Sequence, residues 1–271
     1  MTNPSSGGYS PSSEHPEAVR FPLMELPLVG AILAFMAGAL NAWTIPNAGT
    51  FSTVQSGNVV SLGYWIVQGN WGHFLFPFLS VIGFGVGSAV CGVIMTSMLR
   101  KGRSFTIPVL AFMTVLLVLL GILAIVLVGD HHVDSSSLAL NVNGDKAAQA
   151  KWIAVGISFV AGALGNAYHK DHGMLFGAVA VTFVVQMAFN FLIQSAFKKI
   201  GINGEPNLKW SMIFFSVLLG FTAGGAAGFG IDKWFNGASI FLVAVIALAI
   251  IAKAAALGSK NVDPTPGGSF A

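Results

Sequence analysis

A short polar stretch interrupts an apolar part of the chain and carries the side chains best suited to bind a small polar molecule. Gln55, Ser56 and Asn58 lie within four residues of one another, with Gly57 between the last two. Amide and hydroxyl groups inside an apolar segment can bind a solute or an ion, and glycine allows a helix to break there. The same groups also join membrane helices through hydrogen bonds worth about 0.6–2 kcal/mol. Both interpretations stay open.

Two asparagines follow the two copies of a repeated string. Asn41 directly follows Ala-Gly-Ala-Leu at 37–40, and Asn166 follows the same string at 161–164 after one inserted glycine, Gly165. In a repeat they are related positions, so they either line a pathway together or cap the ends of their helices, because asparagine suits both roles.

Gln186 and Asn190 are four residues apart and therefore share one helix face. We expect that face to point into the helix bundle, where it contacts another helix or a solute. The stretch from His169 through Asp171 to His172 could relay protons, because histidine titrates near neutral pH. A closed metal site needs four ligands, so a cytoplasmic turn is the favoured interpretation. A solvated external loop is favoured likewise for Asp130, His131, His132 and Asp134.

The composition is that of a membrane protein. Of 271 residues, 55% are hydrophobic and only 8% are charged, whereas soluble domains carry about 25% charged residues. No basic run long enough to follow a nucleic acid occurs, and the single cysteine, Cys91, can form neither a disulfide framework nor a zinc site. The motifs of zinc proteases, serine hydrolases and nucleotide-binding loops are absent. We therefore expect no enzyme activity, no metal, no cofactor and no nucleic-acid partner.

Apolar segments set the architecture, because a helix needs roughly 20 apolar residues to span a bilayer. Six of eight segments qualify, whereas the first half of 50–69 is too polar to face lipid, and 173–197 is apolar but carries two amides. The segments are 22–45, 50–69, 73–99, 105–129, 150–168, 173–197, 209–231 and 237–257. The sequence predicts an all-α membrane protein with about six transmembrane helices and two broken or re-entrant helices.

Charge selects among the topologies. If all eight segments span, the repeats are parallel and the basic residues divide eight against five between the two sides. If 50–69 and 173–197 return to their own sides, an odd number of spans inverts the second repeat. Only Lys146, Lys151 and Lys233 are then external, and ten basic residues are cytoplasmic, as the positive-inside rule favours. Those ten are Arg20, Arg100, Lys101, Arg103, Lys170, Lys198, Lys199, Lys209, Lys253 and Lys260. A seven-span arrangement also stays open, because 173–197 is long.

The chain therefore divides into two inverted membrane repeats, 22–129 and 150–257, joined by an external linker at 130–149. A disordered tail at 1–21 and a flexible tail at 258–271 complete it, and both termini are cytoplasmic in this arrangement. Irregular backbone at membrane depth survives only inside protein or beside a wet cavity, so the two broken helices should meet near the midplane.

The positions of glycines and of acidic residues lead to two further expectations, about helix packing and about ion coupling. Glycines four residues apart, at Gly83 and Gly87 and again at Gly220 and Gly224, predict closely packed helices. Acidic residues lie only at the ends of spans, so coupling to protons or sodium lacks its usual carboxylate carrier.

Several motifs of the first repeat together resemble the YoaK-like family of uncharacterised bacterial multi-pass membrane proteins. They are Ala-Gly-Ala-Leu-Asn-Ala-Trp at 37–43, Gly-Thr-Phe-Ser-Thr-Val-Gln-Ser-Gly-Asn at 49–58, Leu62-Gly63 and Gln-Gly-Asn-Trp at 68–71. The resemblance implies about six spans in a bacterial inner membrane and no known activity. This chain has Asn41 where the family has an acidic residue, and Val181-Thr-Phe183 near the place where a second Ser/Thr-Gly-Asn would stand.

The favoured function is a channel or transporter for an unidentified small polar solute, embedded in the lipid bilayer. The candidate pathway residues are Asn41, Gln55, Ser56, Asn58, Asn166, Gln186 and Asn190. A non-transporting scaffold or sensor, a protein that needs a partner subunit and, least favoured, a membrane enzyme remain as alternatives. The sequence does not determine the oligomeric state.

Overall fold

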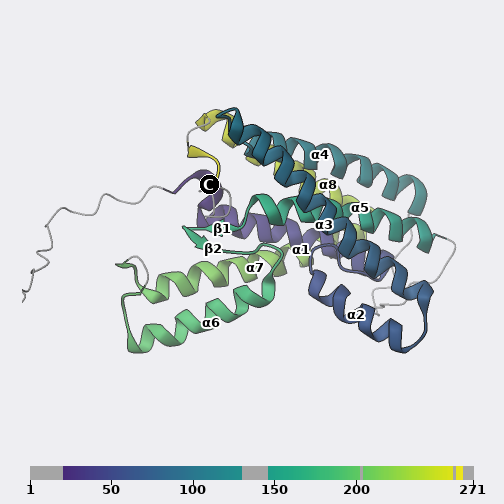
Figure 1. The fold of residues 1–271 in the computed structure, drawn as a ribbon, viewed down its shortest axis with the longest axis horizontal. Helices are drawn as coiled ribbons and strands as arrows, with labels where there is room; N and C mark the ends of the chain where they lie inside the picture. The colour runs from purple at the N-terminus through teal and green to yellow at the C-terminus, as the bar shows by residue number, and fades with distance from the viewer. Residues whose placement is uncertain (1–20, 130–145, 202–203, 259–260, 265–271) are drawn as a thin grey trace, which may run out of the picture.

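Most of the described chain is helical (Figure 1). The structure is a computed structural model that describes residues 21–129, 146–201, 204–258 and 261–264. The linker residues Asp130, His131, His132 and Asp134 lie outside the described residues, as does the predicted tail apart from Phe21.

The first half of the chain contains four α-helices after a short 3-10 turn, η1 (Leu23–Glu25). These helices are α1 (Pro27–Ala48), α2 (Gln55–Val67), α3 (Trp71–Arg100) and α4 (Thr106–Leu123). The last of them continues as a π-helical turn, η2 (Ala124–Val128). Proline at the first position of α1 suits a helix start because that position needs no N–H donor. Gly49, in the left-handed region at φ 63°, ends the same helix.

The second half repeats this order, with a small hairpin added after its first helix. Its elements are α5 (Ala147–Ala167), β1 (Lys170–Asp171), β2 (Met174–Leu175), α6 (Val181–Phe197), α7 (Asn207–Asp232) and α8 (Ala238–Leu257). The two strands pair antiparallel.

Within the described residues, six helices are long and apolar enough to cross a membrane, and α2 and α6 are the two that are not. The predicted helical membrane fold with six spans and two shorter elements is therefore confirmed.

The core forms where α1 and α5 pack between the other helices. α1 lies along α7 and α3 lies along α5, while α4 pairs with α8. Glycines permit the first two contacts: a Cβ atom added at Gly87 or Gly224 would lie less than 3.0 Å from the backbone of Phe159 or Phe35. Close packing at the glycine rows is thus confirmed, because small residues let helix backbones approach.

The segment after α8 is docked on the bundle, which corrects the predicted flexible tail from residue 258 at the positions described. Val262 is buried and its carbonyl accepts a hydrogen bond of 3.1 Å from the N–H of Met24. Asp263 accepts hydrogen bonds from the N–H groups of Phe105 and Thr106 at 2.9 and 3.0 Å. A carboxylate there supplies the N-terminal cap that α4 lacks in its own sequence.

The two short helices each pack on one neighbour, α2 on α3 and α6 on α7. Both lie on the same side of the bundle in Figure 1 and run from near the centre of the view toward opposite ends. After α1 the chain turns back along that helix. This is seen from Thr53, whose hydroxyl bonds to the carbonyl of Ala37, the eleventh of the 22 residues of α1. α2 therefore begins level with the middle of α1.

Candidate functional site

The loop between α1 and α2 is held by Asn41, which projects from the second half of α1. Its Oδ1 accepts hydrogen bonds from the N–H groups of Ser52 and Thr53 at 3.0 and 3.1 Å, and from the Ser52 hydroxyl at 3.1 Å. Its Nδ2 donates to the Thr53 hydroxyl. All three residues are buried, so Asn41 gives this loop the backbone partners that secondary structure gives elsewhere.

Asn58 plays the same part from the first turn of α2. Its Oδ1 accepts from the Thr50 hydroxyl at 2.9 Å and from the Phe51 N–H at 3.1 Å. Its Nδ2 donates to the carbonyl of Phe51 at 2.7 Å and to Oε1 of Gln55 at 2.8 Å. Gln55 in turn donates to the carbonyl of Ser52 at 2.8 Å. The two asparagines therefore fix both ends of one turn.

Two serines join this turn to the other half of the protein. The hydroxyl of Ser80, on α3, donates to the Phe51 carbonyl at 3.1 Å and shares a short hydrogen bond with the hydroxyl of Ser158 on α5. We call the connected set the polar loop network; its members are Asn41, Thr50, Ser52, Thr53, Gln55, Asn58, Ser80 and Ser158.

The polar loop network is closed on itself. Among the described residues, buried side-chain polar atoms without a hydrogen-bond partner occur elsewhere but not in this network. Buried amides that are fully paired stiffen a structure, and their carbonyl oxygens are already used by the protein. The network can therefore hold the start of α2 in place, whereas binding a solute with Asn41 or Asn58 would first require breaking these bonds.

The other predicted residues lie apart from this network. Ser56 is exposed on the first turn of α2, next to the network but not bonded into it. Asn166 is half-buried, and its Nδ2 faces Sδ of Met95 at 3.7 Å. The structure thus brings Asn41, Gln55 and Asn58 together but leaves Asn166 on its own.

Gln186 and Asn190 are exposed on the outer face of α6. The expectation that their face points into the bundle is wrong, because Val184, Ala188 and Phe191 form the buried face. Apolar side chains occur on several faces of α6, so the positions of the two amides were not enough to identify its buried face. Asn190 accepts a hydrogen bond from the next amide along the helix, Gln194, at 3.0 Å.

A second cluster surrounds the β1–β2 hairpin; the sequence pointed to the stretch at 169–172 but not to its distant partners Glu25 and Glu205. Glu25 is fully buried and Asp171 is 3% exposed. His172 is buried beside the ring of Phe21, and its Nε2 lies 2.9 Å from a carboxylate oxygen of Glu205. The structure has a turn here, as in the favoured interpretation, but Asp171 and His172 are buried in it, and its cytoplasmic location stays a prediction. Glu25 lies far from the hairpin in sequence, so local sequence patterns could not reveal that the two are in contact.

We call this set the hairpin cluster: Glu25, Asp171, His172, Glu205 and Lys209. Burial, and secondly the negative charge of Glu25, together raise the pKa of Asp171 from 3.8 to about 7. Burial also opposes ionisation of Glu205, but hydrogen bonds from Lys209 and His172 outweigh it and lower the pKa of that carboxyl. Within the described residues, no group of three metal-ligating side chains could hold a metal ion.

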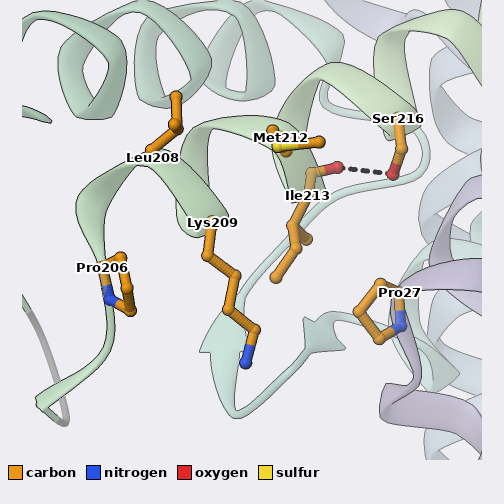
Figure 2. A pocket seen from close by; sticks show the side chains of 7 residues that line it. All are labelled: Pro27, Pro206, Leu208, Lys209, Met212, Ile213 and Ser216. Carbon is orange, nitrogen blue, oxygen red and sulfur yellow. Dashed lines mark hydrogen bonds between the residues drawn. The ribbon is translucent and has the colours of Figure 1, made fainter.

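An open, mostly apolar hollow lies beside the hairpin cluster, between the starts of α1 and α7 (Figure 2). Pro27, Pro206, Met212 and Ile213 form much of its lining, and Lys209 reaches across it. None of the seven predicted pathway residues lines this hollow, so it does not add to the polar loop network.

The chain belongs to the family described as "Protein of unknown function (DUF1275)", whose model matches residues 29–254. The predicted resemblance to an uncharacterised family is confirmed at this level, and the name YoaK-like stays a prediction. Neither the curated proteins nor the solved structures include a match to the chain.

Proposed function

We propose that this member of the DUF1275 family is a channel or transporter for a small polar solute. The observation that carries the proposal is the pair of short helices. At 13 and 17 residues, α2 and α6 are about 20 and 25 Å long, against a hydrocarbon core of about 30 Å. A helix that begins part-way through the bundle exposes unpaired backbone groups at its start, which membrane transport proteins use to bind solutes.

The contacts between the ends of the helices support an inverted repeat. The hairpin after α5 meets η1 before α1, through a 2.7 Å hydrogen bond from His172 N–H to the carbonyl of Glu25. The end of α5 thus lies at the start of α1, so the two helices run in opposite directions. The segment after α8 likewise meets the start of α4 through Asp263. If the repeats were parallel, the start of α5 would instead lie beside the start of α1, and the start of α8 beside the start of α4.

The glycine contacts support the same relation between the halves. Three close approaches of α1 and α7 recur between α5 and α3, with residue numbers that rise by 124 (159 − 35) from α1 to α5 and fall by 137 (224 − 87) from α7 to α3. The matching contacts are Gly224 with Phe35 and Gly87 with Phe159, Gly38 with Phe221 and Gly162 with Phe84, and Gly220 with Ala31 and Gly83 with Val155.

The arrangement of charge supports an orientation with both termini in the cytoplasm of a bacterial cell. The N-terminal η1 and the segment after α8 meet at one end, near Arg103 and Lys170. Lys146 is at the other end, where it donates to the carbonyl of Val128 at 2.9 Å. An excess of basic residues marks the cytoplasmic side.

In this proposal the polar loop network positions α2, and the exposed first turn of α2 contacts the solute. Asn41 and Asn58 are positioning residues because their amides are already paired. Ser56, which is exposed and lies outside the network, is the polar side chain of this turn that remains for the solute. This role for Ser56 is narrower than the seven-residue pathway expected from the sequence.

The closed polar loop network favours a second candidate, a non-transporting membrane scaffold or sensor. In that case the amides only hold helices together. Asn58→Ala separates the two: a folded variant that has lost flux favours a pathway, whereas a variant that no longer folds favours a structural clamp.

The test is solute flux into liposomes that contain the purified full-length protein, with a panel of small neutral polyols, amides and sugars as probes. Ser56→Leu places a bulky apolar side chain at the exposed start of α2, and we expect it to abolish flux. Ser195→Leu makes the same change at the far end of α6 and should leave flux intact. Flux no greater than in empty vesicles for every probe would refute the proposal.

A further inference from the structure

The β1–β2 hairpin is docked on η1, just before α1, by two backbone N–H groups that both donate to Glu25. The turn residues His172 and Gly173 have φ values of 51° and 77°. The N–H of His172 donates to the carbonyl of Glu25 at 2.7 Å, and the N–H of Gly173 donates to its Oε2 at 3.0 Å. These two amide protons are therefore protected only while the hairpin is docked.

Docking buries a carboxyl group for which the described chain provides no partner. Asp171 is 3% exposed, and neither of its side-chain oxygens has a hydrogen-bond partner. A Cβ atom added at Gly30 would lie less than 3.0 Å from one of them, so the carboxyl packs directly on the backbone of the first turn of α1. An ionised carboxylate without a partner is strongly disfavoured in such a place, and the group instead takes up a proton.

Among the described residues, the charged groups of the hairpin cluster and Lys170 are the neighbours of Asp171 that bear on its charge. Glu25 faces it from η1 with a like charge. Lys170 precedes it in β1, and successive side chains of a strand point to opposite faces. Across the hairpin, Glu205 binds both His172 and Lys209. No cation among these neighbours pairs with Asp171.

We propose that Asp171 is a proton-binding site that latches the hairpin at 170–175 onto the start of α1. With its proton bound, Asp171 is neutral and the hairpin stays docked. After loss of the proton, the charge drives the carboxyl into water and the hairpin leaves Glu25. The proton site does not depend on a transported solute. Only the idea that the hairpin, which precedes α6, also gates a pathway rests on the proposed function.

The direction of the pH dependence follows from the pKa of Asp171. It is raised from 3.8 to about 7, first by burial and then by the charge of Glu25. The docked hairpin therefore holds a proton that the undocked one releases, so docking is strongest at low pH. It weakens up to about tenfold per pH unit as the pH rises from about 4 to about 7, and then stays constant.

Glu205 acts in the opposite direction and in another range. Its pKa is lowered from 4.5, so the stability that it contributes is present above that value and is lost only as the pH falls below it. Measurements between about pH 5 and about pH 8 therefore isolate Asp171 from Glu205.

Hydrogen–deuterium exchange of a peptide covering 169–176, in the full-length protein in detergent, tests the latch. After correction for the intrinsic pH dependence of exchange, the wild-type peptide should lose protection progressively up to about pH 7. Asp171→Asn is neutral at every pH and should keep the peptide protected throughout. Asp263→Asn, a change at a half-buried carboxyl that has hydrogen-bond partners of its own, should retain the wild-type pH profile.

Two results would overturn the latch. One is wild-type protection that stays constant across this pH range, which needs no variant to fold. The other is an Asp171→Asn profile that parallels the wild type. Because no solute is present, the outcome is independent of the flux experiment.

Discussion

The two glycine contacts at the centre of the bundle allow a sharp test of both the packing and the relation between the halves. Gly87 on α3 faces Phe159 on α5, and Gly224 on α7 faces Phe35 on α1. Changing either glycine to alanine would put a Cβ atom less than 3.0 Å from the facing backbone, a distance at which the helices must move apart.

The magnitude follows from two opposing effects. Overpacking of a tight contact costs about 1–3 kcal/mol or more, while alanine is better than glycine inside a helix by about 1 kcal/mol. Matched controls isolate the first effect. Gly85 and Gly225 lie in the same helices with nothing within 4 Å of an added Cβ, so alanine there gains the helix preference alone. We expect each contact variant to be about 1–3 kcal/mol less stable than its control.

Thermal unfolding of the detergent-solubilised protein measures this difference. In a chain of this size, about 1 kcal/mol corresponds to roughly 2–4 °C in the midpoint, so Gly87→Ala should unfold several degrees below Gly85→Ala. Gly224→Ala and Gly225→Ala should differ by a similar amount. Equal midpoints within either pair would refute the close approach, and a large difference in one pair only would argue against equivalent contacts.

Three further predictions concern other parts of the structure. Asn41→Ala leaves two buried N–H groups unpaired at about 1–3 kcal/mol each and should lower the midpoint strongly, whereas Asn41→Asp keeps an acceptor for both and should lower it much less; equal losses would contradict the assigned bonds. Asp263→Ala removes the cap of α4, which should cost about 0.5–2 kcal/mol and expose the C-terminal segment to carboxypeptidase digestion; unchanged digestion would refute the docking. Gln186→Ala should leave the midpoint within about 0.5 kcal/mol of wild type, as expected for an exposed position.

The membrane helices could be predicted because their signals are local. Long apolar runs, with polar or glycine-rich breaks between them, locate α1, α3 and α4 to within a few residues. The glycine spacing likewise predicts close packing, although it does not name the partner helix. The sequence also identified 50–69 as unusual, because its polar first half cannot face lipid, and this segment contains the loop and α2.

The candidate site was harder to predict because its contacts link distant parts of the chain. Three of the expected amides meet in the polar loop network, yet sequence patterns could not reveal that they bond to each other rather than to a ligand. Glu25 and Asp171 lie 146 positions apart (171 − 25), and each alone resembles a polar residue at the end of a span. The rings of Phe21 and Trp210 reach the same hairpin from two further segments and contact His172.

The segments that lead into the two short helices differ in how they respond to pH. The loop before α2 is closed by neutral amides and hydroxyls, with Asn41 and Asn58 at its ends, so its hydrogen bonds do not change as the pH varies near neutrality. The hairpin before α6 is closed around Asp171, whose pKa of about 7 places its protonation within the physiological range. If α2 and α6 frame one pathway, the α2 side is the fixed half and the α6 side is the half that a proton can move.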